Sequence, residues 1–352
     1  MKKNISLLLG LAFCLAVLAA AGGGDPLISR SYLEGDFSRT LETMVNSRLD
    51  ASDEAIRSGR PPAVGEAAAP GAQELMLKEG DVLSCQTGVS ATLLSGEAHS
   101  ADGALVDVTG GAEIPAGQQL QTGHRYIAAE SAAFTVASPT AVLLCEGGGT
   151  LTASLSPDYF AVSRALRSLR LFQGSGSGFG EGFDLHLAPT RGEGLVMFLR
   201  ILGEEQQALA YTGSHPFTDV PAWLDRYVAW AYAQGYANGV SPDQFGCEMQ
   251  LSSVEYEEFL LRALGYSTAG VDDYNTSLER ALTCGALTPG EFAMLRNQPF
   301  LRAQVAYISY YTLDMPVSGG SQTLAQRLIG AGVMTEAQLA SAKAQITSLR
   351  LE

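Results

Sequence analysis

The sequence predicts a multidomain protein of α and β structure, in which a small all-β sandwich or roll precedes a mostly α-helical domain made of three repeats. Two observations carry this prediction. Short strand-forming runs separated by turn residues fill positions 75–155. Helical segments with a shared residue pattern recur three times within positions 184–352. Positions 156–183, a predicted helix and a Gly/Ser-rich joint, separate the two domains.

Positions 1–21 indicate a secretory signal peptide. Lys2 and Lys3 precede an apolar run from Ile5 to Leu18, and Ala19–Ala21 offers a small-residue cleavage site. No other segment is long and apolar enough to cross a bilayer, so we expect a secreted protein with no membrane span after cleavage.

Positions 22–74 are expected to form a helix from Leu33 to Ile56, followed by a linker rich in Pro, Ala and Gly.

The whole chain is acidic, with a formal net charge of −15. An acidic chain with no basic run argues against nucleic acid as a partner. Wall polymers are commonly anionic as well, so any attraction to them must be local.

The prediction of a β domain over 75–155 rests on closely spaced turns. Dipeptides such as Ser95-Gly96 and Thr122-Gly123 separate short runs rich in Val, Leu, Thr and aromatic residues. Such spacing favours a compact sandwich, roll or barrel. The expected strands are Asp81–Cys85, Ala91–Leu94, Leu105–Val108, Arg125–Ala129, Ala133–Ala137 and Ala141–Cys145.

Four cysteines follow the signal peptide, without a CxxC spacing or a metal-ligand pattern. Cys85 with Cys145, and Cys247 with Cys284, are candidate disulfides in an oxidising compartment. Four buried free thiols are the alternative, and the sequence leaves both open.

The segment 156–183 begins with Ser156-Pro157-Asp158, which predicts a helix start because it combines a capping side chain with proline and an acid. Three arginines at helical spacing are interpreted as a solvated face, with contact to an anionic polymer as the alternative. The stretch Gly174–Gly182 is expected to be a flexible joint. The three arginines are Arg164, Arg167 and Arg170.

The helical repeats align on one acid or amide near the start of a helix. Glu193 and Glu255 are each followed by Arg at plus seven and Leu-Gly at plus nine and ten, and Gln304 begins a degenerate third copy. Each of these helices is followed by another helix with a glycine near its end. These glycines are Gly235, Gly285 and Gly332.

The helix starts predict capping interactions. Thr190 with Glu193 forms a capping box, and Ser252 with Glu255 forms a second one. Leu301 stands where the third copy should carry a hydroxyl, which is expected to cost that helix about 1 kcal/mol unless another group substitutes.

These starts resemble the Thr-Arg-Ala-Glu signature of S-layer homology domains. The chain reads Thr190-Arg191-Gly192-Glu193 in the first copy. The second copy has Ser253 in place of the arginine, and the third keeps Arg302 but has Gln304 for the acid. The Phe-Thr-Asp-Val-Pro element, Phe217–Pro221, is intact once. The resemblance covers positions 184–345, about half of the chain.

The resemblance implies a three-lobed helical domain that binds secondary cell-wall polysaccharide, often through pyruvylated sugars, at the cell wall or cell surface. Arg191 and Arg302 would then donate to a sugar carboxylate, as guanidinium geometry allows. Trp223 would stack on a sugar ring, and its alternative role is a core residue. Asp219 corresponds to a loop acid, and its alternative role is to cap the following helix.

The sequence shows no sign of catalysis. The four histidines fit neither HxxxH nor HExxH, and no GxSxG is present. Phe179 stands where a GxGxxG motif from Gly174 needs its third glycine. The adjacent acids Glu257-Glu258 are interpreted as a solvated face. We therefore expect a non-enzymatic protein without cofactor or metal.

Two hypotheses rival wall binding by the helical domain. In the first, the helical domain is a degenerate scaffold and the β domain binds protein or glycan. In the second, the chain is a member of an envelope complex.

Overall fold

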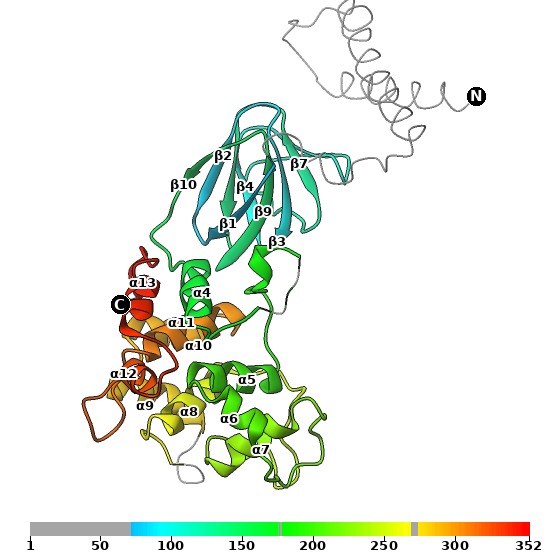
Figure 1. Cartoon of the computed structure of the whole chain (residues 1–352). Helices are drawn as coiled ribbons and strands as arrows, with labels where there is room; N and C mark the ends of the chain where they lie inside the picture. The colour runs from blue at the N-terminus through cyan, green and yellow to red at the C-terminus, as the bar shows by residue number, and fades with distance from the viewer. Residues whose placement is uncertain (1–71, 175, 177, 269–273) are drawn as a thin grey trace, which may run out of the picture. The chain divides into compact units, whose positions relative to one another are not determined.

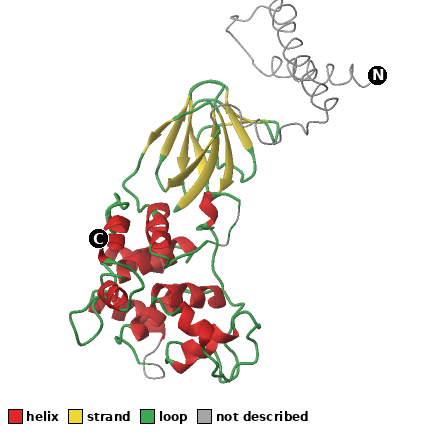
Figure 2. Cartoon of the chain, in the orientation of Figure 1, coloured by secondary structure: helices red, strands yellow, loops and turns green. Residues whose placement is uncertain are grey.

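The computed structural model describes residues 72–174, 176, 178–268 and 274–352. The predicted signal peptide at 1–21, the predicted helix at 33–56 and nearly all of the linker lie outside these residues. The described part consists of an antiparallel β domain followed by a helical domain (Figures 1 and 2). No helix within these ranges has the length and apolar character that crossing a membrane requires.

The β domain consists of two antiparallel sheets around one apolar core. The larger sheet has the strand order β1-β9-β3-β7-β5-β6, and the smaller has the order β10-β2-β8-β4. The strands are β1 Gln73–Lys78, β2 Val82–Cys85, β3 Ser90–Ser95, β4 Ala98–Asp102, β5 Leu105–Asp107, β6 Ala112–Ile114, β7 Arg125–Ala128, β8 Ala132–Val136, β9 Thr140–Glu146 and β10 Thr150–Thr152.

Alternating side chains give each strand an inner face. On β7, for example, Tyr126 is buried and Arg125 is exposed. Side chains of both sheets, including Leu83 of β2 and Leu143 of β9, share the core. The predicted compact β domain is confirmed.

The six predicted strands correspond to β2, β3, β5, β7, β8 and β9, with ends shifted by a residue or two. Sequence patterns missed β1, β4, β6 and β10. β6 and β10 have three residues each, too short for a pattern, and β4 is composed of small and polar residues. β1 was divided between the predicted linker and the β domain.

Glycine is required at two of the predicted turns. Gly96 and Gly103 adopt φ values of 81° and 78°. A Cβ atom at Gly96 would lie 2.2 Å from the carbonyl oxygen of Thr140, and one at Gly103 would lie 1.9 Å from that of Ser131. Both the left-handed backbone and the close approach of another strand therefore exclude a side chain.

The helical domain has a continuous apolar core. Its α-helices are α4 Tyr159–Ser168, α5 Arg191–Ile201, α6 Glu205–Ala210, α7 Asp225–Ala233, α8 Ser253–Ala263, α9 Ser277–Cys284, α10 Pro289–Asn297, α11 Arg302–Thr312, α12 Leu324–Gly330 and α13 Glu336–Lys343.

Three buried helices of equal length, α5, α8 and α11, lie at the centre of this domain. The rings of Phe198 on α5 and Phe259 on α8 lie 5.5 Å apart. Tyr256 on α8 shares a hydrogen bond of 2.6 Å with the hydroxyl of Ser309 on α11. A glycine with a left-handed backbone stands at or just after the end of α7, α9 and α12. These glycines are Gly235 with φ of 72°, Gly285 with φ of 80° and Gly332 with φ of 74°.

The segment between the β domain and α5 is held by specific contacts. Helix α4 packs against α11, with the rings of Tyr159 and Tyr307 5.4 Å apart, so α4 belongs to the helical core. The short helix η2 (Gly180–Gly182) carries Glu181, whose carboxylate pairs with Arg164 at 2.9 Å and with Arg167. These two arginines are therefore engaged within the chain, and the flexibility of the joint stays a prediction.

Candidate functional site: the starts of the central helices and the α7 lobe

Both predicted capping boxes are present. The Thr190 hydroxyl accepts from the Glu193 amide at 3.2 Å, and the Glu193 carboxylate accepts from the Thr190 amide at 2.9 Å. Ser252 and Glu255 repeat this arrangement at 3.3 and 2.9 Å. At α11 the capping hydroxyl is missing, as the sequence predicted, but Gln304 still accepts from the amide of residue 301 at 3.0 Å. Half of the box therefore remains.

We expect Thr190→Ala to lower the free energy of unfolding by about 1 kcal/mol, because the Glu193 amide loses its acceptor at the start of α5. Urea denaturation followed by circular dichroism measures this difference. Thr190→Ser keeps the acceptor and serves as the matched control. Equal stability of the alanine and serine variants would contradict the role of the hydroxyl.

Arg191, predicted to meet a sugar carboxylate, lies inside the domain with an exposed fraction of 1%. Its Nε donates to the Phe245 carbonyl at 3.1 Å, and its Nη1 donates to the Glu255 carboxylate at 2.6 Å. The guanidinium carbon lies 5.1 Å from the ring centres of both Phe245 and Phe259. The side chain thus joins the start of α5 to the start of α8.

Arg302 has a comparable place at the start of α11, with an exposed fraction of 8%. Its Nε donates to the Phe183 carbonyl and its Nη2 to the Gln173 carbonyl, both at 3.1 Å. Ser253 stands at the same position of α8, and its hydroxyl donates to the Leu295 carbonyl at 3.1 Å. At all three starts, this residue ties a central helix to a carbonyl of a neighbouring segment.

The expectation that Arg191 and Arg302 face a ligand is therefore corrected. Sequence spacing alone could not reveal their direction, because their acceptors lie on loops 54 and 119 residues away in the chain. A guanidinium that is almost fully buried and already bonded contributes to packing of the domain instead of to its surface.

Asp219 orders the loop that precedes α7. Its two carboxylate oxygens accept from the amides of Phe245 and Gly246, each at 2.7 Å, and its carbonyl accepts from the Cys247 thiol. Burial opposes ionisation of Asp219, but these amide hydrogen bonds hold its pKa below the ordinary value. The alternative role as a helix cap is wrong, because α7 begins after Leu224 without a side-chain cap.

Trp223 lies on the surface, immediately before α7, with an exposed fraction of 57%. The alternative of a core tryptophan is therefore wrong. Three other large apolar side chains within residues 215–250, here named the α7 lobe, are also exposed. Their exposed fractions are 41% for Tyr232, 48% for Val240 and 53% for Met249.

Packing inside the α7 lobe holds its surface in place. The ring of Phe217 contacts that of Tyr232 edge-to-face, with the ring centres 5.5 Å apart. The imidazole of His215 stacks with the ring of Phe217, also with the ring centres 5.5 Å apart. Nε2 of His215 lies 3.2 Å from the carboxylate of Asp225, on the first turn of α7. The Phe-Thr-Asp-Val-Pro element thus supports an exposed aromatic surface.

A buried group of acids and arginines was not predicted. Glu258 is fully buried and accepts from Arg262 Nε at 2.7 Å, from the Ser267 hydroxyl at 2.6 Å and from Arg280. Glu257 is 2% exposed. The interpretation of this acid pair as a solvated face is therefore wrong. The spacing of Glu258 and Arg262, four residues apart on one helix, was a signal for their ion pair.

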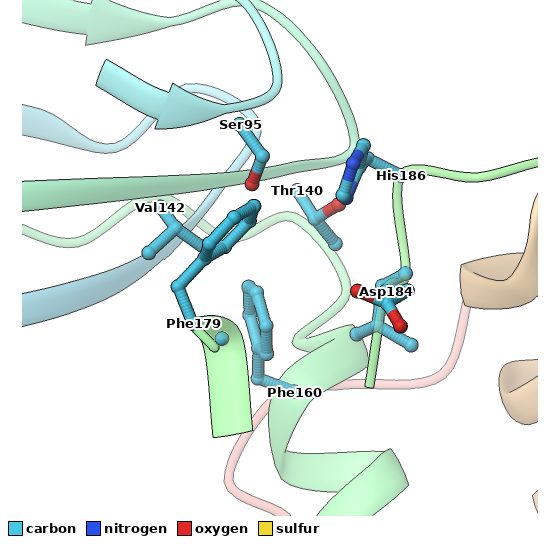
Figure 3. Close-up of a pocket in the computed structure, with 9 residues that line it drawn as sticks. Ser95, Thr140, Val142, Phe160, Phe179, Asp184 and His186 are labelled. Atoms are coloured by element: carbon cyan, nitrogen blue, oxygen red, sulfur yellow. The ribbon is translucent and has the colours of Figure 1, made fainter. Parts of the chain in front are cut away.

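A small pocket lies where the β domain meets the helical domain (Figure 3). In Figure 3 the rings of Phe160 and Phe179 lie close to the strand that carries Val142. Burial lowers the pKa of His186 at its rim, which favours the neutral imidazole. The lining therefore combines the rings of Phe160 and Phe179 with polar side chains such as Thr140 and Asp184.

Comparison of the chain with protein-family models and with curated proteins gave no match. The resemblance to S-layer homology domains therefore rests on the motif residues of the sequence.

Proposed function

We propose that this chain is a secreted, non-catalytic cell-surface protein whose helical domain binds secondary cell-wall polysaccharide. The observation that carries the proposal is the exposed indole of Trp223, which lies two residues after the Phe217–Pro221 element. A tryptophan offers a large, rigid contact surface with one polar end, which suits the apolar C–H face of a sugar ring. Tyr232 adds a second exposed aromatic side chain in the same lobe.

The positions of the three central helices support the proposal. α5, α8 and α11 have the same length and begin with related capping contacts, and each carries a side chain that ties its start to a neighbouring carbonyl. This regularity is what a domain of three S-layer homology repeats would show. In the second copy, Ser253 stands in place of the arginine, and its hydroxyl donates to a carbonyl as the arginines do. The second copy therefore retains the contact that ties its helix start to a neighbouring segment.

The local charge needed for an anionic polymer is available on α7. Arg226 lies exposed on the first turn, three residues after Trp223. Its Nη1 donates to the Leu209 carbonyl at 2.6 Å. A guanidinium has five N–H donors, so this one bond leaves others for a carboxylate or phosphate group of the polymer. Arg226 thereby replaces Arg191 and Arg302 as the proposed cationic contact.

We expect Trp223→Ala to weaken binding of the chain to purified wall sacculi about tenfold, equivalent to about 1.4 kcal/mol for one aromatic contact. The melting temperature should stay unchanged because the side chain is mostly exposed. Leu155→Ala is the matched control, since Leu155 is a large apolar residue, 93% exposed, outside the α7 lobe. A Trp223→Ala variant that pellets as well as this control would contradict the proposed contact.

A hollow on the β domain favours a second candidate function. Amide, hydroxyl and carboxylate side chains line it, namely Glu97, Gln119, Gln121 and Thr122. Such groups can recognise a polar ligand such as a glycan or a peptide. In this candidate function, the β domain is the binding module and the helical repeats are its scaffold.

A further inference from the structure

Of the four cysteines in the described part, two meet in the core of the β domain. Cys85 ends β2 in the smaller sheet, and Cys145 lies on β9 in the larger sheet. Their exposed fractions are 3% and 2%, and both belong to the core between the sheets. Alternation along β2 turns Leu83 and Cys85 inward, and alternation along β9 turns Leu143 and Cys145 inward. The Cys145 thiol is near enough to Cys85 to add to the rise in the pKa of the Cys85 thiol that burial causes.

The other two cysteines are engaged separately. The Cys247 thiol donates to the Asp219 carbonyl at 2.7 Å, and the Cys284 thiol donates to the Ala281 carbonyl at 3.4 Å. All four cysteines are free thiols in this structure. The fold therefore favours one of the two pairings that the sequence allowed, and it gives no contact between Cys247 and Cys284.

We propose that Cys85 and Cys145 form a disulfide that links the two sheets when the chain folds in an oxidising compartment. A disulfide requires two cysteines that face each other at short range, and Cys85 and Cys145 point from facing sheets into the same core. The bridge would close the long loop from β2 to β9 and restrict the unfolded chain. It is independent of wall binding by the helical domain.

The oxidant is a small-molecule disulfide. One cysteine thiolate attacks it, which forms a mixed disulfide and releases one small thiolate. The second cysteine thiolate then attacks the protein sulfur of the mixed disulfide and releases the second small thiolate. In total, two protein thiols lose two protons and two electrons, and one small disulfide is reduced to two thiols.

The bridge should form while the sandwich is still open. Burial raises the pKa of Cys85 to about 12, and the nearby Cys145 adds to the effect. Burial also raises the pKa of Cys145. In the folded domain both thiols are therefore protonated and shielded, whereas exchange needs an accessible thiolate. For the same reason, the closed bridge should resist reductants added to the folded protein.

The test is to refold the full chain, with Cys14→Ser to remove the fifth cysteine, in a buffer of reduced and oxidised glutathione. The folded product is then unfolded in acid, alkylated with N-ethylmaleimide and digested without reduction for mass spectrometry. We expect Cys85 linked to Cys145 in most molecules, with Cys247 and Cys284 alkylated. Full alkylation of Cys85 and Cys145 in folded protein, or a bond from either to another cysteine, would overturn the proposal.

A second pair of variants keeps the test decisive if single cysteine changes impair folding. Cys247→Ser with Cys284→Ser should still form the bridge, and its oxidised form should melt at a higher temperature than its reduced form. Cys85→Ala with Cys145→Ala should show the same melting temperature under both conditions. A persistent difference between oxidised and reduced samples of this last variant would count against the bridge as its cause.

Discussion

Replacing Arg191 with alanine is expected to lower the free energy of unfolding of the helical domain by about 3–5 kcal/mol. The substitution leaves the buried Phe245 carbonyl without its donor and the Glu255 carboxylate, 20% exposed, without its ion-pair partner. It also opens space between the rings of Phe245 and Phe259. Removing one member of such a set leaves polar groups buried and unpaired, which costs more than the pair contributed.

Urea denaturation of the Arg191→Ala variant, followed by circular dichroism, measures this loss. Arg226→Ala is the control: it removes an equally charged but exposed side chain, and we expect a change within about 0.5 kcal/mol. If Arg191→Ala retained its stability and lost wall binding instead, the guanidinium would belong to the ligand site, contrary to its position in the structure.

The second large effect concerns pH. Glu257 lies on α8 with an exposed fraction of 2%. Burial, together with the neighbouring Glu291 and Glu258, raises its pKa from 4.5 to about 8, with Arg350 acting in the opposite direction. Burial, with a contribution from the nearby Glu257, also raises the pKa of the Cys284 thiol. The folded protein therefore binds a proton at Glu257 that the unfolded chain releases at about pH 4.5.

The sign of the effect follows from this difference. Protonated Glu257 contributes fully to stability below about pH 4.5, and this contribution falls as the pH rises through about 8. The slope is about 1.4 kcal/mol per pH unit between the two pKa values. Glu257→Gln keeps the shape and stays neutral, so it should become progressively more stable than the natural protein from pH 5 to pH 8.

Urea denaturation of both proteins at a series of pH values between 5 and 9 measures this difference. Glu113→Gln, at an exposed position of β6, is the matched control for the loss of one carboxylate. A difference between Glu257→Gln and the natural protein that does not vary with pH would mean that Glu257 is ionised in the folded state.

Local signals in the sequence predicted local structure well. Thr190 and Glu193 are three residues apart, so their capping box depends on nothing outside one turn of helix. The inner strands of the β domain were also predictable, because turns with glycines such as Gly96 and Gly103 delimit apolar runs. Short or polar strands such as β4 and β10 depend on pairing with β8 and β2, and so they were missed.

The candidate site was harder to predict, because exposure depends on partners far away in the chain. Arg191 and Trp223 are both residues that a polysaccharide site could use, and one is buried while the other is exposed. The partner that buries Arg191 is the loop at Phe245, which Asp219 holds in place from another loop. A sequence shows the residue types of such a network but not which of them meet.

Co-sedimentation of the purified chain with bacterial wall sacculi, before and after the secondary polymers are stripped, tests wall anchoring most directly. The proposal predicts that the chain pellets with intact sacculi and stays in solution with stripped ones. Failure to pellet with either preparation, or equal pelleting with both, would contradict binding to secondary wall polysaccharide. The hollow at Glu97 and Gln119 on the β domain would then become the leading candidate site.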